Sequence, residues 1–209
     1  PDLSILDWQD HLDKVIEMDV EHISAYCLTV EEKTTLHHLV KTGKLVPAGE
    51  DMQSEQFELL SKTLMAAGYE HYEISNFGKP GKHSCHNSNY WKGIPYLGIG
   101  PSAHSYDGIN RRWNVANNIL YMNRTSDAWY ETETLSPEDR WNELLLTGLR
   151  TSHGVDQHSL FSIMEPAECF HSKVRRFISE GWMFEENERL ILSIEGRLKA
   201  DYIASELFV

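Results

Sequence analysis

The stretch His22–Val30 reads HISAYCLTV, and it decides the expected fold. It is rich in apolar and β-branched residues, nearly free of charge, and bounded by a glutamate at each end. A short apolar run of this kind is typical of a strand buried on both faces, as in a parallel sheet. The sequence therefore predicts a buried strand over residues 22–30.

Helices and a second strand are expected around this run. Ser4 stands three residues before Asp7, as in a capping box, which predicts a helix directly before the strand. Further helices are expected over 35–42 and 51–67 from their apolar spacing and following glycines. The stretch 69–77, YEHYEISNF, predicts another strand. Helices alternating with strands predict the α/β class, or α+β for the chain as a whole.

Residues 78–115 are punctuated by glycine and proline, and His83–Gly93 reads HSCHNSNYWKG. This stretch has neither helical nor strand periodicity, so we expect a loop. It follows a predicted strand, and in α/β folds the functional groups gather on loops at the carboxyl ends of strands.

Two interpretations of this loop stay open. In one, His86 bonds a backbone carbonyl while Tyr90 and Trp91 cover the core. In the other, the imidazole coordinates iron and the aromatic rings lie against a flat macrocycle, with Cys85 as a competing axial ligand. A zinc site at His83, Cys85 and His86 is disfavoured, because the loop lacks a fourth ligand.

A second unit is expected from residue 135 onward. Ser136 followed by Pro137 and two acidic residues is a strong helix start. Further helices are expected over 156–164 and 166–180, then a hairpin and a final helix after Ser193, which together give a winged-helix outline. Its eight basic and thirteen acidic residues, with an acidic wing tip at 185–188, favour a packing module over nucleic-acid binding.

Composition narrows the function further. The formal net charge of the 209-residue chain is −13, which disfavours nucleic acid as a partner. No apolar run approaches the ~20 residues of a membrane-spanning helix. Three widely separated cysteines argue for a reducing compartment, so we expect a cytoplasmic protein. The chain starts at Pro1 without a methionine, and we expect it to be part of a longer protein.

Five motifs together resemble one family. They are HISAYCLTVE at 22–31, GYEHYEISNFGKPG at 68–81, HNSNYW at 86–91, YLGIGPSAHSY at 96–106 and RRWNV at 111–115. In order and spacing they are similar to the radical-SAM family of oxygen-independent coproporphyrinogen III oxidase, and to its haem-chaperone branch, the HemW proteins. The resemblance covers essentially the whole chain, and the His-Asn-x-x-Tyr-Trp motif is its most specific element.

The resemblance implies a fold and a function. Residues 1–134 would form the last part of a partial (β/α) barrel, and 135–209 a small helical domain with a winged-helix-like hairpin. The implied function is a chaperone that binds haem or porphyrin and delivers haem to acceptor haem proteins, including membrane-associated ones. The alternative is an enzyme of porphyrin biosynthesis that decarboxylates coproporphyrinogen III by radical chemistry.

The resemblance also assigns residues. It places haem at His86, Asn87, Tyr90 and Trp91, with Cys85 where a basic residue is expected. Thr29, Glu73 and Asn76 would belong to the wall of the S-adenosylmethionine pocket.

The family's [4Fe–4S] cluster is held by a Cys-x-x-x-Cys-x-x-Cys motif that this chain lacks. Radical chemistry is therefore not expected from the chain alone. A partial barrel would also expose a strand edge and apolar faces, which predicts self-association.

Overall fold

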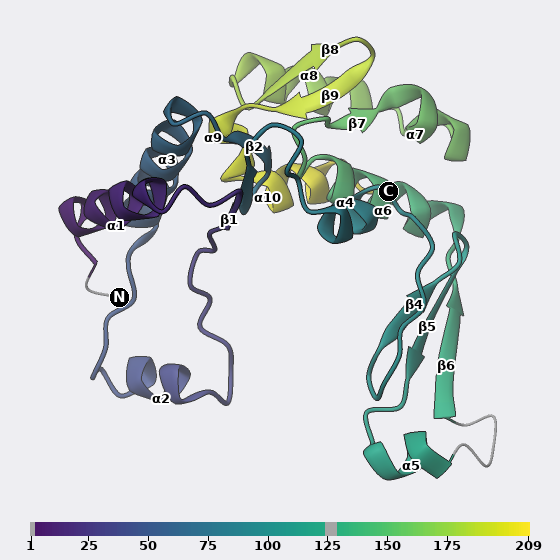
Figure 1. Ribbon diagram of the computed structural model, residues 1–209. Coiled ribbons are helices and arrows are strands. Elements are labelled where there is room, and N and C mark those ends of the chain that lie inside the picture. Colours follow the sequence, from purple (N-terminus) through teal and green to yellow (C-terminus); the bar gives the residue numbers. More distant parts are fainter. Residues whose placement is uncertain (1–2, 124–128) are drawn as a thin grey trace.

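The computed structural model describes residues 3–123 and 129–209 (Figure 1). The first part contains α1 Ile5–Glu17, β1 His22–Ser24, α2 Thr35–Lys41, α3 Glu50–Ala66, β2 Glu70–Glu73, β3 Asn76–Gly78, α4 Cys85–Trp91, β4 His104–Tyr106, β5 Asn110–Asn114, α5 Asn118–Asn123 and β6 Tyr130–Thr134. The second part contains α6 Pro137–Gly148, β7 Val155–Asp156, α7 Gln157–Ile163, α8 Phe170–Ser179, β8 Met183–Glu186, β9 Arg189–Leu192, α9 Ile194–Arg197 and α10 Ala200–Glu206.

The described strands form three small sheets, ordered β1-β3-β2, β4-β5-β6 and β7-β9-β8. All pairs within them are antiparallel. The sheet β4–β6 forms an arm, defined here as residues 94–123 and 129–134, which extends away from the other helices and carries α5 at its far end (Figure 1). The mixed α/β class expected from the sequence is confirmed.

The expected long strand over 22–30 is wrong in length and in environment. Only β1 is regular, and it pairs antiparallel with β3 at the edge of its sheet. The residues that follow are open to solvent, with Tyr26 72% and Leu28 54% exposed. An apolar run has the composition of a buried strand, but its burial depends on neighbours that lie far away in sequence.

The expected strand over 69–77 is a hairpin. It turns at Ile74 and Ser75, so that β2 pairs with β3. The turn contains no glycine or proline, which explains why it gave no signal. Instead the Glu73 carboxylate accepts a hydrogen bond from the Ser75 backbone N–H at 3.0 Å, which closes the turn from its own side chain.

The expected loop over 83–93 contains a helix, α4. Ser84 is its N-cap and accepts a hydrogen bond from the Asn87 N–H at 3.2 Å. Helix α4 ends at Trp91 with Lys92 as its C-cap, and the next residue, Gly93, has a φ of +62° that suits glycine. Seven residues are too few to show a clear apolar period, so the cap was the one readable signal.

Residues 135–209, called the second unit here, contain the predicted helices and hairpin and also a short strand, β7, that was not predicted. Ser136 and Asp139 form a complete capping box with Pro137 at the first helical position. The predicted hairpin is β8–β9, and it packs with α6, α8 and α10 around a core that contains Trp141, which is fully buried. One expected helix after Ser193 is two helices, α9 and α10. In the part of the chain that the structure describes, no helix is both long and apolar enough to cross a bilayer.

Candidate functional site

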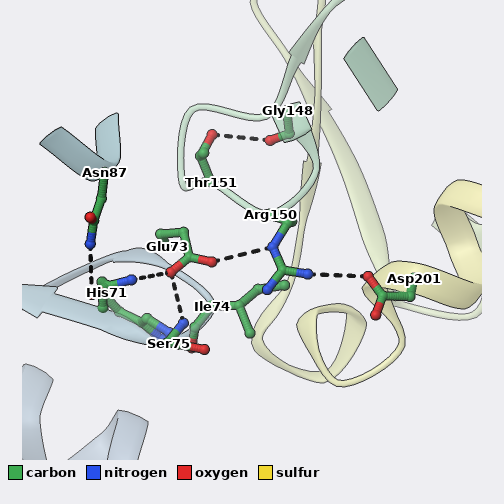
Figure 2. Close-up of polar contacts among 10 residues, drawn as sticks. His71, Glu73, Ile74, Ser75, Asn87, Gly148, Arg150, Thr151 and Asp201 are labelled. Atoms are coloured by element: carbon green, nitrogen blue, oxygen red, sulfur yellow. Dashed lines mark hydrogen bonds and ion pairs between the residues drawn. The ribbon is translucent and has the colours of Figure 1, made fainter. Parts of the chain in front are cut away.

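A buried carboxylate lies where the first hairpin meets the second unit (Figure 2). The Glu73 side chain is 1% exposed. Its Oε2 accepts hydrogen bonds from the Ser75 N–H and from Nδ2 of Asn76, and its Oε1 accepts one from Nε of Arg150 at 3.3 Å. Burying a charge is costly unless it is paired and hydrogen-bonded, and Glu73 meets both conditions.

Arg150 joins this carboxylate to the last helix. Its Nη1 donates to Oδ1 of Asp201, on α10, at 3.2 Å (Figure 2). The main chain meets here too: the Ile74 N–H donates to the Arg150 carbonyl at 3.1 Å, and the Ser152 N–H donates to the Tyr72 carbonyl at 2.9 Å. The hairpin is therefore bound to the second unit by backbone and by side chains.

Asn76 extends the network toward α4. Its Oδ1 accepts a hydrogen bond from the Ser24 hydroxyl at 2.7 Å and a longer one from Nδ2 of Asn87 at 3.4 Å. Glu73, Asn76 and Asn87, which the sequence predicted as site residues, thus lie together. Thr29 does not join them, because it is exposed in the irregular segment after β1.

Beside this network, α4 packs against α6, and both helices border a cleft of about 1510 Å³. One face of α6 lines it with Arg140, Leu144 and Thr147 at helical spacing. Asn87, Tyr90 and Trp91 line it from α4, and Arg150 lies in the wall between them. The cleft exceeds the ~300–1,000 Å³ of ordinary small-molecule sites, so it has room for a large flat ligand.

His86 is placed differently from its neighbours. It is exposed and is not among the residues that line the cleft. Its ring lies edge-on to Tyr90, with ring centroids 5.1 Å apart, and Tyr90 lies edge-on to Tyr96 at 4.8 Å. An imidazole at the end of an aromatic row is a chemically suitable iron ligand beside a stacking surface.

Cys85 is exposed and does line the cleft. Within residues 3–123 and 129–209, no group of three or more His, Cys, Asp or Glu side chains is arranged to hold a metal ion. Cys27, Cys85 and Cys169 are each free and exposed. The described residues therefore do not fit an iron–sulfur cluster.

Two residues of the site had no signal in the sequence. Tyr72 stacks on His83 at 4.1 Å, lies 2.7 Å through its hydroxyl from Nε2 of His22, and accepts a hydrogen bond from the Ser84 N–H. Burial raises the pKa of Tyr72 and lowers the pKa of His22, so both are neutral near pH 7. Arg150 was also missed, because a lone arginine after a helix carries no spacing pattern.

Comparison with known proteins places the chain. Residues 135–198 match the model of the HemN C-terminal domain. The heme chaperone HemW of Mycobacterium tuberculosis H37Rv is 32% identical over 199 residues, which is 94% of this chain and 50% of that protein. The HemW of Bacillus subtilis is 33% identical, over 70% of this chain and 39% of that protein.

A more distant relative is the mitochondrial radical S-adenosyl methionine domain-containing protein 1 of Danio rerio. It is 31% identical over 78% of this chain and 39% of that protein. The chain spans about half the length, or less, of these curated relatives.

A solved structure shares the fold. It is that of coproporphyrinogen III oxidase (HemN) from Escherichia coli, described as a radical SAM enzyme. It superposes with a TM-score of 0.67 and 14% identity, over 97% of this chain and 51% of that one. At this identity the likeness establishes the fold alone. The HemW relative that is 32% identical over 94% of this chain, together with the matched HemN C-terminal domain, establishes that the chain belongs to the HemW family of HemN-related proteins.

Proposed function

We propose that the protein acts as a haem chaperone, which binds haem at α4 and passes it to haem proteins. The observation that carries the proposal is the exposed pair His86 and Tyr90 within the His-Asn-x-x-Tyr-Trp motif. The relatives named heme chaperone HemW support it. His86, Asn87, Tyr90 and Trp91 form the proposed haem site.

The exposure of His86 suits transfer. A haem protein that keeps its haem encloses it, whereas a carrier must release its cargo on contact with an acceptor. An axial histidine on the surface of a short helix holds the iron on one side and leaves the rest of the macrocycle accessible. We further propose that delivery takes place in the cytoplasm, to acceptors that include membrane-associated haem proteins.

We propose that the radical-SAM cofactors are bound only by a longer protein of which this chain would form a part. A [4Fe–4S] cluster and S-adenosylmethionine would supply radical chemistry. Thr29, Glu73 and Asn76 remain predicted wall residues for the adenosyl cofactor, although polar atoms of Glu73 and Asn76 already form hydrogen bonds within the chain.

We also propose that the chain divides at residue 135 into a barrel part and a C-terminal domain. Self-association also stays a prediction, and exposed Leu97, Ile99 and Ile119 would contribute to it.

The proposal is tested by haemin titration followed in the Soret band. We expect the band to shift in the wild-type protein, and His86→Ala to abolish the shift. His158→Ala, which removes an exposed histidine on α7, should leave it intact. A shift that survives His86→Ala and disappears in Cys85→Ala would overturn the His86 assignment.

The function itself has a separate test. A wild-type protein that does not shift the Soret band would overturn the chaperone proposal. Turnover of coproporphyrinogen III under anaerobic conditions would favour the oxidase alternative instead.

A further inference from the structure

The motif 86–91 divides between two faces of α4. Residues four apart share a face of a helix, so His86 pairs with Tyr90 and Asn87 pairs with Trp91. The structure separates these pairs by burial, because His86 and Tyr90 are exposed whereas Asn87 and Trp91 are half-buried. The outward pair contains His86, the proposed iron ligand, and the inward pair lines the cleft and contacts the body of the protein.

The inward pair meets the network around Glu73. Asn87 reaches Asn76 at 3.4 Å, and Asn76 donates to Glu73. The guanidinium of Arg150 lies 5.5 Å from the centroid of the Trp91 ring. The indole N–H of Trp91 is buried and has no hydrogen-bond partner among the described residues. The indole is thus held by packing and by the cation, not by a hydrogen bond of its own.

Arg150 is itself fixed on two sides. Glu73 accepts from its Nε and Asp201 from its Nη1, so the planar guanidinium is clamped between carboxylates from β2 and α10. A planar guanidinium can do this while stacking near an aromatic ring, whereas a lysine ammonium is a point charge that cannot. The clamp sets where the cation lies relative to Trp91.

We propose that Arg150 is a positioning residue for haem binding, which acts through Trp91 to fix the orientation of α4 and so of His86. The inference rests on the proposed function, since it assumes that α4 is the haem site. Arg150 belongs to the second unit, whereas the residues of the proposed haem site all lie before residue 135. The inference therefore gives the second unit a role in haem binding.

The side chain of Arg150 can be tested apart from the fold. The backbone bonds of Ile74 and Ser152 across this junction do not depend on it. Arg150→Lys keeps a positive charge beside the buried Glu73. The double variant Glu73→Gln/Arg150→Gln removes both charges together, and replacing a buried ion pair by neutral groups is usually tolerated better than removing one partner.

The control is Arg176→Gln. Arg176 also contacts two carboxylates, Glu206 and Glu180, and lies 4.5 Å over the ring of Phe177. It lies on α8 and does not line the cleft. It therefore matches Arg150 in its contacts but not in its position.

Haemin affinity from Soret titration, with thermal unfolding in parallel, decides the question. We expect Arg150→Lys and the double variant to bind haemin roughly two- to fivefold more weakly, the factor that one cation–π contact supplies. The Soret maximum should not move, because His86 remains the ligand. Arg176→Gln should bind as the wild type does.

A double-mutant cycle with Trp91→Leu identifies the route of the effect. If Arg150 acts through Trp91, Arg150→Lys should change the affinity of the Trp91→Leu protein very little. The same loss in both backgrounds would overturn the inference, as would wild-type affinity in both Arg150 variants. These results leave the proposed function standing if His86→Ala still abolishes binding. Unchanged binding in His86→Ala would instead overturn the His86 assignment.

Discussion

The second unit and the arm differ in what stabilises them. The larger core cluster draws every buried member from residues 141–207, including Trp141 and Phe177, which are fully buried. The arm exposes Leu97, Ile99, Ile119 and other large apolar side chains. It is held by strand pairing and by contacts such as Arg112 over the Tyr130 ring at 3.8 Å. Burial stabilises the first region, and mainly local hydrogen bonds and ring contacts shape the second.

Helix α4 lies between these regions and belongs fully to neither. It packs on α6 of the second unit, while Tyr90 contacts Tyr96 at the start of the arm. None of its residues is fully buried. A helix of seven residues is not stable on its own, so its position depends on the few side chains that anchor it. A candidate site on α4 would therefore need a residue such as Arg150 to hold the helix in place.

The largest effect we expect comes from removing one tryptophan in each region. Trp141→Ala should lower the free energy of unfolding by about 3–5 kcal/mol, because it empties a fully buried site and breaks the bond from its indole N–H to the Leu207 carbonyl. Trp113→Ala, on β5 of the arm, should cost less than about 1.5 kcal/mol, because Trp113 is only half-buried. Urea unfolding measures both.

The matched pair decides whether the comparison holds. Equal losses for the two tryptophans would mean that the arm shares the core of the second unit. A loss confined to a separate, earlier transition in Trp113→Ala would instead show that the arm unfolds by itself.

The accuracy of the sequence-based prediction also differs between the second unit and the first part of the chain. In the second unit the signals were local. The Ser136 capping box, the helix spacing around Trp141 and the turn of the β8–β9 hairpin are each formed by residues close to one another in sequence. Local preference and final packing agree there, so the helices and the hairpin were predicted. The sequence missed the short strand β7, the later start of α8 at Phe170 and the division of the last helix.

In the first part the deciding contacts are distant. The strand over 22–30 shortened to β1, because only β3 pairs with it. The hairpin turn at Ile74 depends on Glu73 and on the docking of residue 150, which lies 77 positions away from Glu73. The sequence grouped His86, Tyr90 and Trp91, but it could not divide them between faces of a helix that it did not predict.

The next effect, of intermediate size, tests the junction between the second unit and the first hairpin, where Nη1 of Arg197 donates to the His71 carbonyl. His71 is buried on β2, where its Nδ1 lies 3.0 Å from the Ser61 hydroxyl and its Nε2 lies 3.0 Å from the Ile74 carbonyl. Burial, with the nearby Arg197, lowers the pKa of His71 to about 4. Its ordinary value is 6.5, so the unfolded chain binds more protons between these values, and stability must fall as the pH falls through this window.

We expect the loss to reach about 3 kcal/mol between pH 7 and pH 4, from the size of the pKa difference. Urea unfolding at several pH values measures it. His71→Gln keeps an amide that can bond Ser61 and should remove this part of the pH dependence, while His158→Gln should not. A pH profile identical in wild type and His71→Gln would show that His71 does not cause this loss of stability.

The smallest change in the free energy of unfolding is expected from removing two helix N-caps, one on α6 and one on α4. Ser136 caps α6 inside the second unit, and Ser84 caps α4. Ser136→Ala should lower the global free energy of unfolding by about 1 kcal/mol, the usual value of an N-cap. Ser84→Ala removes the same kind of bond, but α4 adds no fully buried residue to either core, so global unfolding should change by less than about 0.5 kcal/mol.

The local consequence should be the reverse. Without its cap, α4 is held by side-chain contacts such as those of Asn87, Tyr90 and Trp91. Its amide hydrogens should therefore exchange faster in Ser84→Ala, while those of α6 do not change. If Ser84→Ala instead lowered global stability as much as Ser136→Ala, α4 would be part of the main cooperative unit. The core would then hold α4 in place, and Arg150 would contribute little to its position.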